Sequence, residues 1–195
     1  MNDFNLFFGI GIDHILNTGA IDHLLFIVVL CAVYLITDWK KLLVLITAFT
    51  IGHSLTLALS VYDVVRFNSA WVEFLIPLTI VLTALYNLTL SGKAIPRQKI
   101  QINYLLALFF GLVHGMGFAN NIRFMLAESQ SILLPLLGFN LGLELGQIIV
   151  VSILLLLSIL AIKLMKLQHR YWAMGLSLIG LVAGAIMSVQ RIPGM

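Results

Sequence analysis

Four histidines lie within long apolar stretches of this chain, and several acidic residues accompany them. Imidazole nitrogens bind borderline divalent cations such as Ni²⁺, Co²⁺, Zn²⁺, Cu²⁺ and Fe²⁺, whereas Ca²⁺ and Mg²⁺ prefer oxygen ligands. Carboxylates beside such a site neutralise charge or orient the rings through the second nitrogen. The residue types therefore predict a site for a divalent transition metal. Its candidate ligands are His14, Asp22, His23, His53, His114 and Glu144.

Other polar residues accompany these candidates at helical spacing or in the same apolar stretches. Asn140, Glu144 and Gln147 are separated by four and three residues, so they share one face of a helix. We expect a wider set to surround the ion or to lie along its path: Asp13, Thr50, Ser54, Glu73, Asn87, Asn140 and Gln147. A helix–helix contact is the alternative role for Asn87. The single cysteine, Cys31, excludes a Cys-based zinc or iron–sulfur site.

The composition identifies the kind of protein that must position these residues. Of 195 residues, 61% are hydrophobic and 10% are charged, with a mean hydropathy of +1.08. Soluble domains carry roughly 45–50% apolar and about 25% charged residues. The composition therefore excludes a soluble enzyme, a disordered chain and a fibre, and it predicts an integral membrane protein. The net charge of +3 fits loop residues that set topology better than a nucleic-acid interface.

Six apolar segments approach the length of about 20 residues that a membrane helix needs. They are residues 21–36 (short unless extended), 42–62, 71–90, 102–118, 138–162 and 171–189. A seventh apolar stretch, residues 4–16, is short, and it is a further span, a half-helix or a re-entrant segment. We therefore expect an all-α integral membrane protein, with residues 1–195 forming one domain of six or seven transmembrane helices.

Basic residues are unevenly distributed over the loops between these segments. Eight of the eleven fall in loops 37–41, 91–101 and 163–170, whereas Arg66, Arg123 and Arg191 fall on the other side. Loops rich in Lys and Arg are usually cytoplasmic. We therefore expect those three loops in the cytoplasm and the C-terminus outside. The N-terminus is inside if residues 4–16 span the membrane and outside if they do not.

This topology places all the candidate ligands in the outer half of the membrane, although they come from different helices. The topology was derived from Lys and Arg alone, so the agreement is independent support for one site. Asn17, Thr18 and Gly19 favour a break between the two Asp-His pairs. Unwound backbone at membrane depth is tolerated only where it is buried in protein or lines a cavity. The break therefore also points to a site.

Four stretches resemble the HupE/UreJ family of small bacterial membrane proteins. They are GIDHILNTGAIDHLLF (11–26), AFTIGHSLTLALS (48–60), FGLVHGMGFA (110–119) and GFNLGLELGQ (138–147), and Glu73 and Asn87 match further family positions. The resemblance implies nickel or cobalt uptake across the bacterial inner membrane. A fainter, local similarity to nickel/cobalt permeases rests on His14 with Asp22-His23, and on Phe49 with Gly52-His53-Ser54.

The leading hypothesis is a transporter of a divalent transition metal, nickel or cobalt before zinc, copper or iron. The alternative is an intramembrane metalloenzyme, a hydrolase or oxygenase, that uses the same site. A continuous polar path to the cytoplasm would distinguish them, because transport requires one and hydrolysis at the outer face does not. A structural or metal-sensing subunit is a third reading. The expected partners are the lipid bilayer and the metal ion, with no nucleic acid, and a homo-oligomer is left open.

Overall fold

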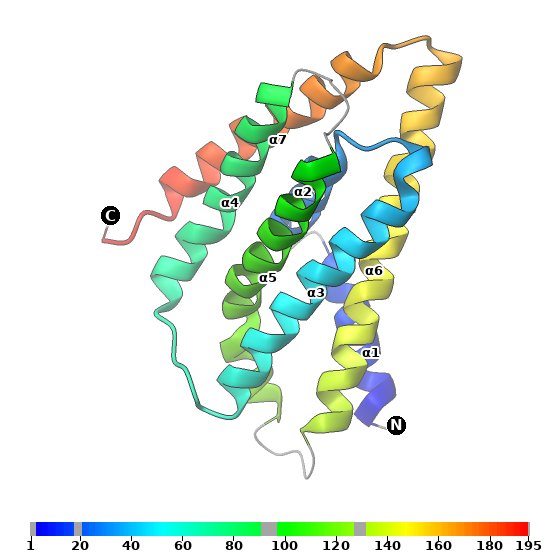
Figure 1. Ribbon diagram of the computed structural model, residues 1–195. Coiled ribbons are helices and arrows are strands. Elements are labelled where there is room, and N and C mark those ends of the chain that lie inside the picture. The colour runs from blue at the N-terminus through cyan, green and yellow to red at the C-terminus, as the bar shows by residue number, and fades with distance from the viewer. Residues whose placement is uncertain (1–2, 18–20, 91–96, 127–131, 195) are drawn as a thin grey trace.

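The computed structural model describes residues 3–17, 21–90, 97–126 and 132–194. In these ranges the chain is helical, with short connections and no β-strand. The helices are α1 (Asp3–Leu16), α2 (Ile21–Cys31), α3 (Trp39–Val61), α4 (Ser69–Leu90), α5 (Arg97–Leu126), α6 (Leu133–Ile159) and α7 (His169–Gln190) (Figure 1). A 3₁₀ turn, η2 (Ile36–Asp38), precedes α3, and a π-helical segment, η3 (Leu160–Leu164), prolongs α6. The expectation of an all-α membrane bundle is confirmed.

Five segments are long and apolar enough to cross a membrane, and each overlaps one of the expected spans along most of its length. They are Ile36–Val61, Ser69–Leu90, Gln101–Leu126, Leu133–Leu164 and His169–Gln190. The expectation for residues 21–36 was wrong in extent, because α2 ends at Cys31 after 11 residues. At 1.5 Å per residue, α2 reaches only about half of the roughly 30 Å hydrocarbon core. The apolar run continues through a turn in which Tyr34 is buried against Asn103 of α5.

α1 and α2 are bent by 68° relative to each other and qualify as a membrane span only as a pair. α1 packs alongside the first half of α6 and runs in the same direction, with Phe4 beside Gly138 and Ile15 beside Gly146. α2 continues along the bundle and also contacts α6. The two helices are therefore the halves of one broken crossing, and the start of α1 lies at the same end of the bundle as the start of α6 (Figure 1). Residues 4–16 form the half-helix among the three alternatives.

Glycines allow α3 and α5 to pack with their backbones in contact. A Cβ on Gly52 would collide with a backbone carbonyl oxygen of α5, and a Cβ on Gly111 would collide with one of α3. Small residues at such positions let membrane helices approach closely. The contact presses the turn of α3 that carries His53 against the turn of α5 that carries His114.

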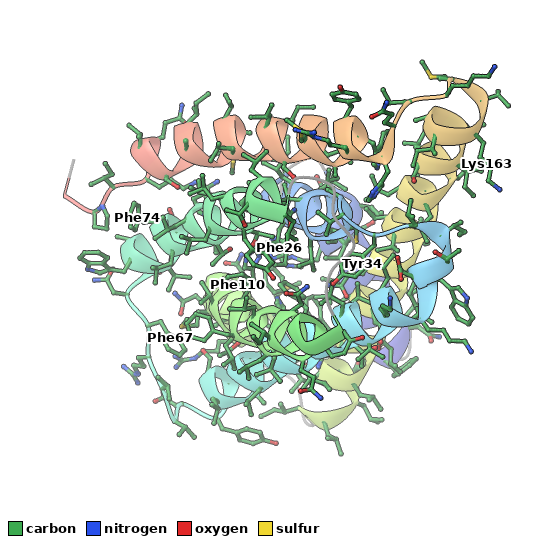
Figure 2. All side chains as sticks on the ribbon, turned by 45° about the horizontal axis from the view of Figure 1, so that its top comes forward. Phe26, Tyr34, Phe67, Phe74, Phe110 and Lys163 are labelled. Carbon is green, nitrogen blue, oxygen red and sulfur yellow. The ribbon has the colours of Figure 1, made fainter. Side chains whose placement is uncertain are left out.

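α2 is the central helix of the bundle. It contacts α4, α6 and α7, and most of its side chains are buried. Figure 2 shows Phe26 of α2 in the interior, whereas Phe74 and Lys163 lie at the periphery. Because α2 begins inside the bundle, its first turn carries Asp22 and His23 into the core, where their side chains are buried.

α5 is longer than the sequence indicated. The expected span ended at residue 118, but α5 continues to Leu126. A helix ends where capping or backbone constraints end it, and residues 119–126 contain neither Gly nor Pro. Polar contacts hold this extension against the start of α4 and the loop before it: Asn120 donates to Ser69 at 3.0 Å, and Arg123 pairs with Asp63 at 3.0 Å.

The α3–α5 contact makes Gly111 a sensitive position. Gly111→Ala places a methyl group where a backbone carbonyl already lies. We therefore expect the free energy of unfolding to fall by about 1–3 kcal/mol, as is typical of overpacking. Gly175→Ala is the matched control, because Gly175 lies on α7 with nothing within 4 Å of its Cβ position. Thermal unfolding in detergent measures both. A Gly111→Ala variant as stable as the Gly175→Ala variant would contradict the close contact.

Candidate metal centre

Three histidines form the core of the candidate site. His14 ends α1, His23 begins α2 and His53 lies within α3, and each offers one nitrogen such that all three nitrogens lie within 4.8 Å of one another. Their ring centroids are 4.6 Å (His14–His23), 5.7 Å (His14–His53) and 6.2 Å (His23–His53) apart. Two nitrogens on one ion are at most about 4.2 Å apart, twice a Zn–N distance. Small ring rotations would therefore bring the three-histidine group onto a single ion.

Four ring nitrogens of this group have no hydrogen-bond partner among the described residues. His14 Nε2, His23 Nε2 and both ring nitrogens of His53 are buried without a hydrogen bond. An unsatisfied buried polar atom typically costs about 1–3 kcal/mol. The surroundings are aromatic, since Phe118 lies 4.3 Å from the His14 ring and Phe139 lies 6.1 Å from the His53 ring, between centroids. Unpaired nitrogens that converge within apolar walls have the chemistry of a metal site.

Asp22 stands behind the His23 ring. Its Oδ1 accepts from the His23 backbone N–H at 2.9 Å and lies 3.0 Å from His23 Nδ1. Its Oδ2 accepts from Arg191 Nη1 at 3.1 Å. A carboxylate on Nδ1 keeps the proton there and leaves the Nε2 lone pair for a metal, the usual arrangement behind a metal-ligating histidine. Asp22 was a candidate ligand, but both its oxygens already accept hydrogen bonds, so its geometry suits orienting His23.

His114 is oriented by a threonine. Thr79 donates its hydroxyl proton to the Ile76 carbonyl at 2.7 Å, so its oxygen, 3.0 Å from His114 Nε2, accepts from that nitrogen. His114 Nδ1 then carries a lone pair, and it has no partner among the described residues. The His114 ring packs edge-on against His23 with centroids 4.9 Å apart. His114 thus adjoins the three-histidine group without belonging to it.

An acidic cavity leads to the histidines. It has a volume of about 500 Å³, and its lining includes His14 and His23 but neither His53 nor His114. Asp13 and Glu73, both exposed, line it at the surface. A cation would therefore meet carboxylates first and imidazoles next. We call this cavity the acidic vestibule.

Glu144 lies apart from the histidines. It accepts a hydrogen bond from Thr47 at 2.6 Å, and Gln147 accepts one from Thr50 at 2.9 Å. Together with Ser54 and Asn140, Glu144 and Thr50 line a shallow groove between α3 and α6. Glu144 points away from the histidines because of how α6 is rotated about its axis. Gly142 packs on α1. Glu144 follows two residues later, about 200° further round the helix, and therefore faces α3. Asn140, Glu144 and Gln147, which the sequence predicted to share one helix face, all lie on the side of α6 that is turned toward α3.

Asn87 and Arg191 lie in different halves of the bundle, each beside a cavity. Asn87 donates to the Val29 carbonyl at 2.7 Å and lies in the other half of the bundle, beside a second cavity. Arg191, which the sequence placed only as an outer basic residue, lines the acidic vestibule and pairs with Asp22. Thr79 also escaped notice. A sign of it was available, because Thr79, Thr83 and Asn87 recur every four residues along one helix face.

Comparison with known proteins identifies the family of this chain. A family model described as HupE / UreJ protein matches residues 1–191. No match was found among curated proteins or among solved structures. The match covers essentially the whole chain, including every helix and every histidine described above. The chain belongs to the HupE/UreJ family.

Proposed function

We propose that this protein transports a divalent transition-metal ion, nickel or cobalt before any other, across the membrane. The observation that carries the proposal is the three-histidine group of His14, His23 and His53, whose buried nitrogens converge at the end of the acidic vestibule. Neutral imidazoles suit these borderline ions. The family is associated with nickel and cobalt transport, which favours these two metals over zinc, copper and iron.

The distribution of charge suggests a direction of passage. The connection from α3 to α4 and the end of α5 lie at the vestibule end of the bundle, and they carry Arg66 and Arg123. The start of α3, the end of η3 and the start of α7 lie at the opposite end (Figure 1), and five basic residues belong to them: Lys40, Lys41, Lys163, Lys166 and Arg170. The end richer in Lys and Arg is usually cytoplasmic. We therefore place the vestibule on the outer side of the bacterial inner membrane. Asp13 and Glu73 would attract the cation from there, and Asp22 would hold His23 in its ligating tautomer.

A line of polar groups extends from the histidines toward the opposite end. Thr79 contacts His114, and Thr83 and Asn87 follow on the same face of α4, all buried. Beyond them Asn103 donates to the Tyr34 hydroxyl at 3.1 Å. Thr83, Asn87, Asn103 and Tyr34 line a cavity of about 330 Å³ whose other walls are largely apolar. Transport needs polar groups in this half of the bundle and hydrolysis at the outer face does not, so these residues favour the transporter over the metalloenzyme.

The first prediction concerns binding. His53→Ala removes one of three converging nitrogens, so we expect the affinity for Ni²⁺ and Co²⁺ to fall more than about 100-fold, beyond the loss seen for outer-shell partners. Uptake into liposomes should be abolished as well. His169→Ala is the matched control, because His169 begins α7 and lies outside the three-histidine group. Calorimetric titration and liposome uptake measure the two effects. Unchanged binding by a folded His53→Ala protein would refute the site.

The second prediction separates transport from binding. In the double variant Thr83→Val, Asn87→Leu, the inner half loses two polar groups and the histidines keep their surroundings. We expect flux into liposomes to fall at least tenfold, because a desolvated cation finds no polar partners beyond His114. A tenfold fall corresponds to a rise of about 1.4 kcal/mol in the barrier to passage. Metal affinity should stay within about twofold. Thr89→Val is the control, since Thr89 is exposed on the same helix.

A metalloenzyme would behave differently in the same experiment. Its reaction at the outer face would not depend on Thr83 or Asn87. Wild-type protein that binds metal tightly but shows no saturable flux would therefore favour the enzyme and count against transport.

A further inference from the structure

We infer that Arg191 is a built-in counter-cation of Asp22 that leaves the carboxylate when a metal ion binds, and that it thereby sets metal affinity. The inference deepens the proposed function and rests on it. Arg191 lies outside the three-histidine group, and its positive charge would balance the negative charge of Asp22 when no metal is bound. The same residue would keep the site from holding metal too tightly to release it.

The first support is the completeness of the Asp22–Arg191 pair. Arg191 Nη1 lies 3.1 Å from Asp22 Oδ2, while Oδ1 is occupied by His23. The Asp22 side chain is 13% exposed. A carboxylate inside a membrane protein is costly unless a cation or several donors stabilise it. In the metal-free protein Arg191 supplies that charge from the far end of the chain.

The second support is the charge balance around the ligands. Three imidazoles that bind through neutral nitrogens bring no negative charge. Asp22 is in hydrogen-bond contact with one of them, His23, and Arg191 already pairs with its carboxylate. A divalent ion would therefore add two positive charges beside an ion pair that offers no net negative charge. If Arg191 withdraws, Asp22 compensates part of the new charge through His23. Metal and Arg191 thus compete for the same carboxylate, and such coupling is reciprocal.

The third support is that Arg191 has room to withdraw. It is the residue after the last turn of α7, where its backbone N–H still bonds the Met187 and Ser188 carbonyls. Its side chain lines the acidic vestibule, which also contains Asp13 and Glu73. The guanidinium can therefore leave Asp22 for another carboxylate or for solvent while the helix stays intact.

Arg123 is a matched control from the same end of the bundle. It pairs with Asp63 at 3.0 Å, but Asp63 is in an exposed loop and also pairs with Arg66 at 2.7 Å. The Arg66 guanidinium, with Arg123 beyond it, holds the pKa of the Asp63 carboxyl below its usual range. Removing Arg123 subtracts the same charge from the protein and leaves a carboxylate that still has a partner.

The first experiment titrates Ni²⁺ and Co²⁺ into purified full-length protein. We expect Arg191→Gln to bind at least about fivefold more tightly than wild type, the lower end of ordinary coupling between sites. Arg191→Lys, which keeps the charge, and Arg123→Gln should stay near wild type. Arg191→Gln protein that binds as wild type does, or more weakly, would overturn the inference. Wild-type protein that binds neither metal would instead overturn the proposed function, and this inference with it.

A second experiment needs no variant, so it does not depend on the folding of Arg191→Gln. Phenylglyoxal modifies free guanidinium groups, and the Arg191 side chain is 33% exposed whereas that of Arg66 is 74% exposed. We expect saturating Co²⁺ to raise the rate of modification of Arg191 about fivefold, as its pairing is lost, with Arg66 unchanged. Mass spectrometry of digested protein reports both sites. A rate at Arg191 that falls or stays constant with metal would refute the withdrawal.

Discussion

A polar side chain inside a membrane protein must find its partners within the protein or in a ligand, because lipid supplies none. In this chain the constraint acts at the start of α2, which lies within the bundle and carries Asp22 and His23 in its first turn. A helix N-terminus favours the carboxylate there. The bend between α1 and α2 brings two helix ends to the histidines. His14 arrives on the end of α1, and Arg191 arrives on the end of α7.

The two sides of the histidine cluster are built differently. His53 and His114 belong to α3 and α5, whose backbones touch through Gly52 and Gly111, so their separation is set by continuous helices. His14 and His23 sit on either side of the break between α1 and α2. One pair of rings is therefore held by long-range packing, and the other by the local geometry of two helix ends. The three-histidine group thus combines one ring held by the packing of two long helices with two rings held at helix ends.

Much of this arrangement could be predicted from the sequence. The long apolar runs located α3, α4, α6 and α7 to within a few residues at most ends, because membrane thickness fixes their length. The residue types at His14, His23 and His53 indicated a metal, and the structure brings these three together. Other features depend on information that sequence patterns lack. The contact of Glu144 with Thr47 depends on the rotation of α6 about its axis, which its glycines determine. The Asp22–Arg191 pair joins residues 169 positions apart, and no local pattern encodes such a contact.

That pair joins the start of α2 to the residue that follows α7, and this has a consequence for how the bundle forms. A chain is synthesised from its N-terminus, so Asp22 leaves the ribosome long before Arg191 does. Until α7 has been inserted, the Asp22 carboxylate lacks the guanidinium of Arg191. Insertion of α7 brings Arg191 to this carboxylate and covers one side of α2, which α7 contacts. The buried carboxylate beside the histidines thus gains this partner only once α7 is in place, and a chain arrested before α7 would leave Asp22 without it.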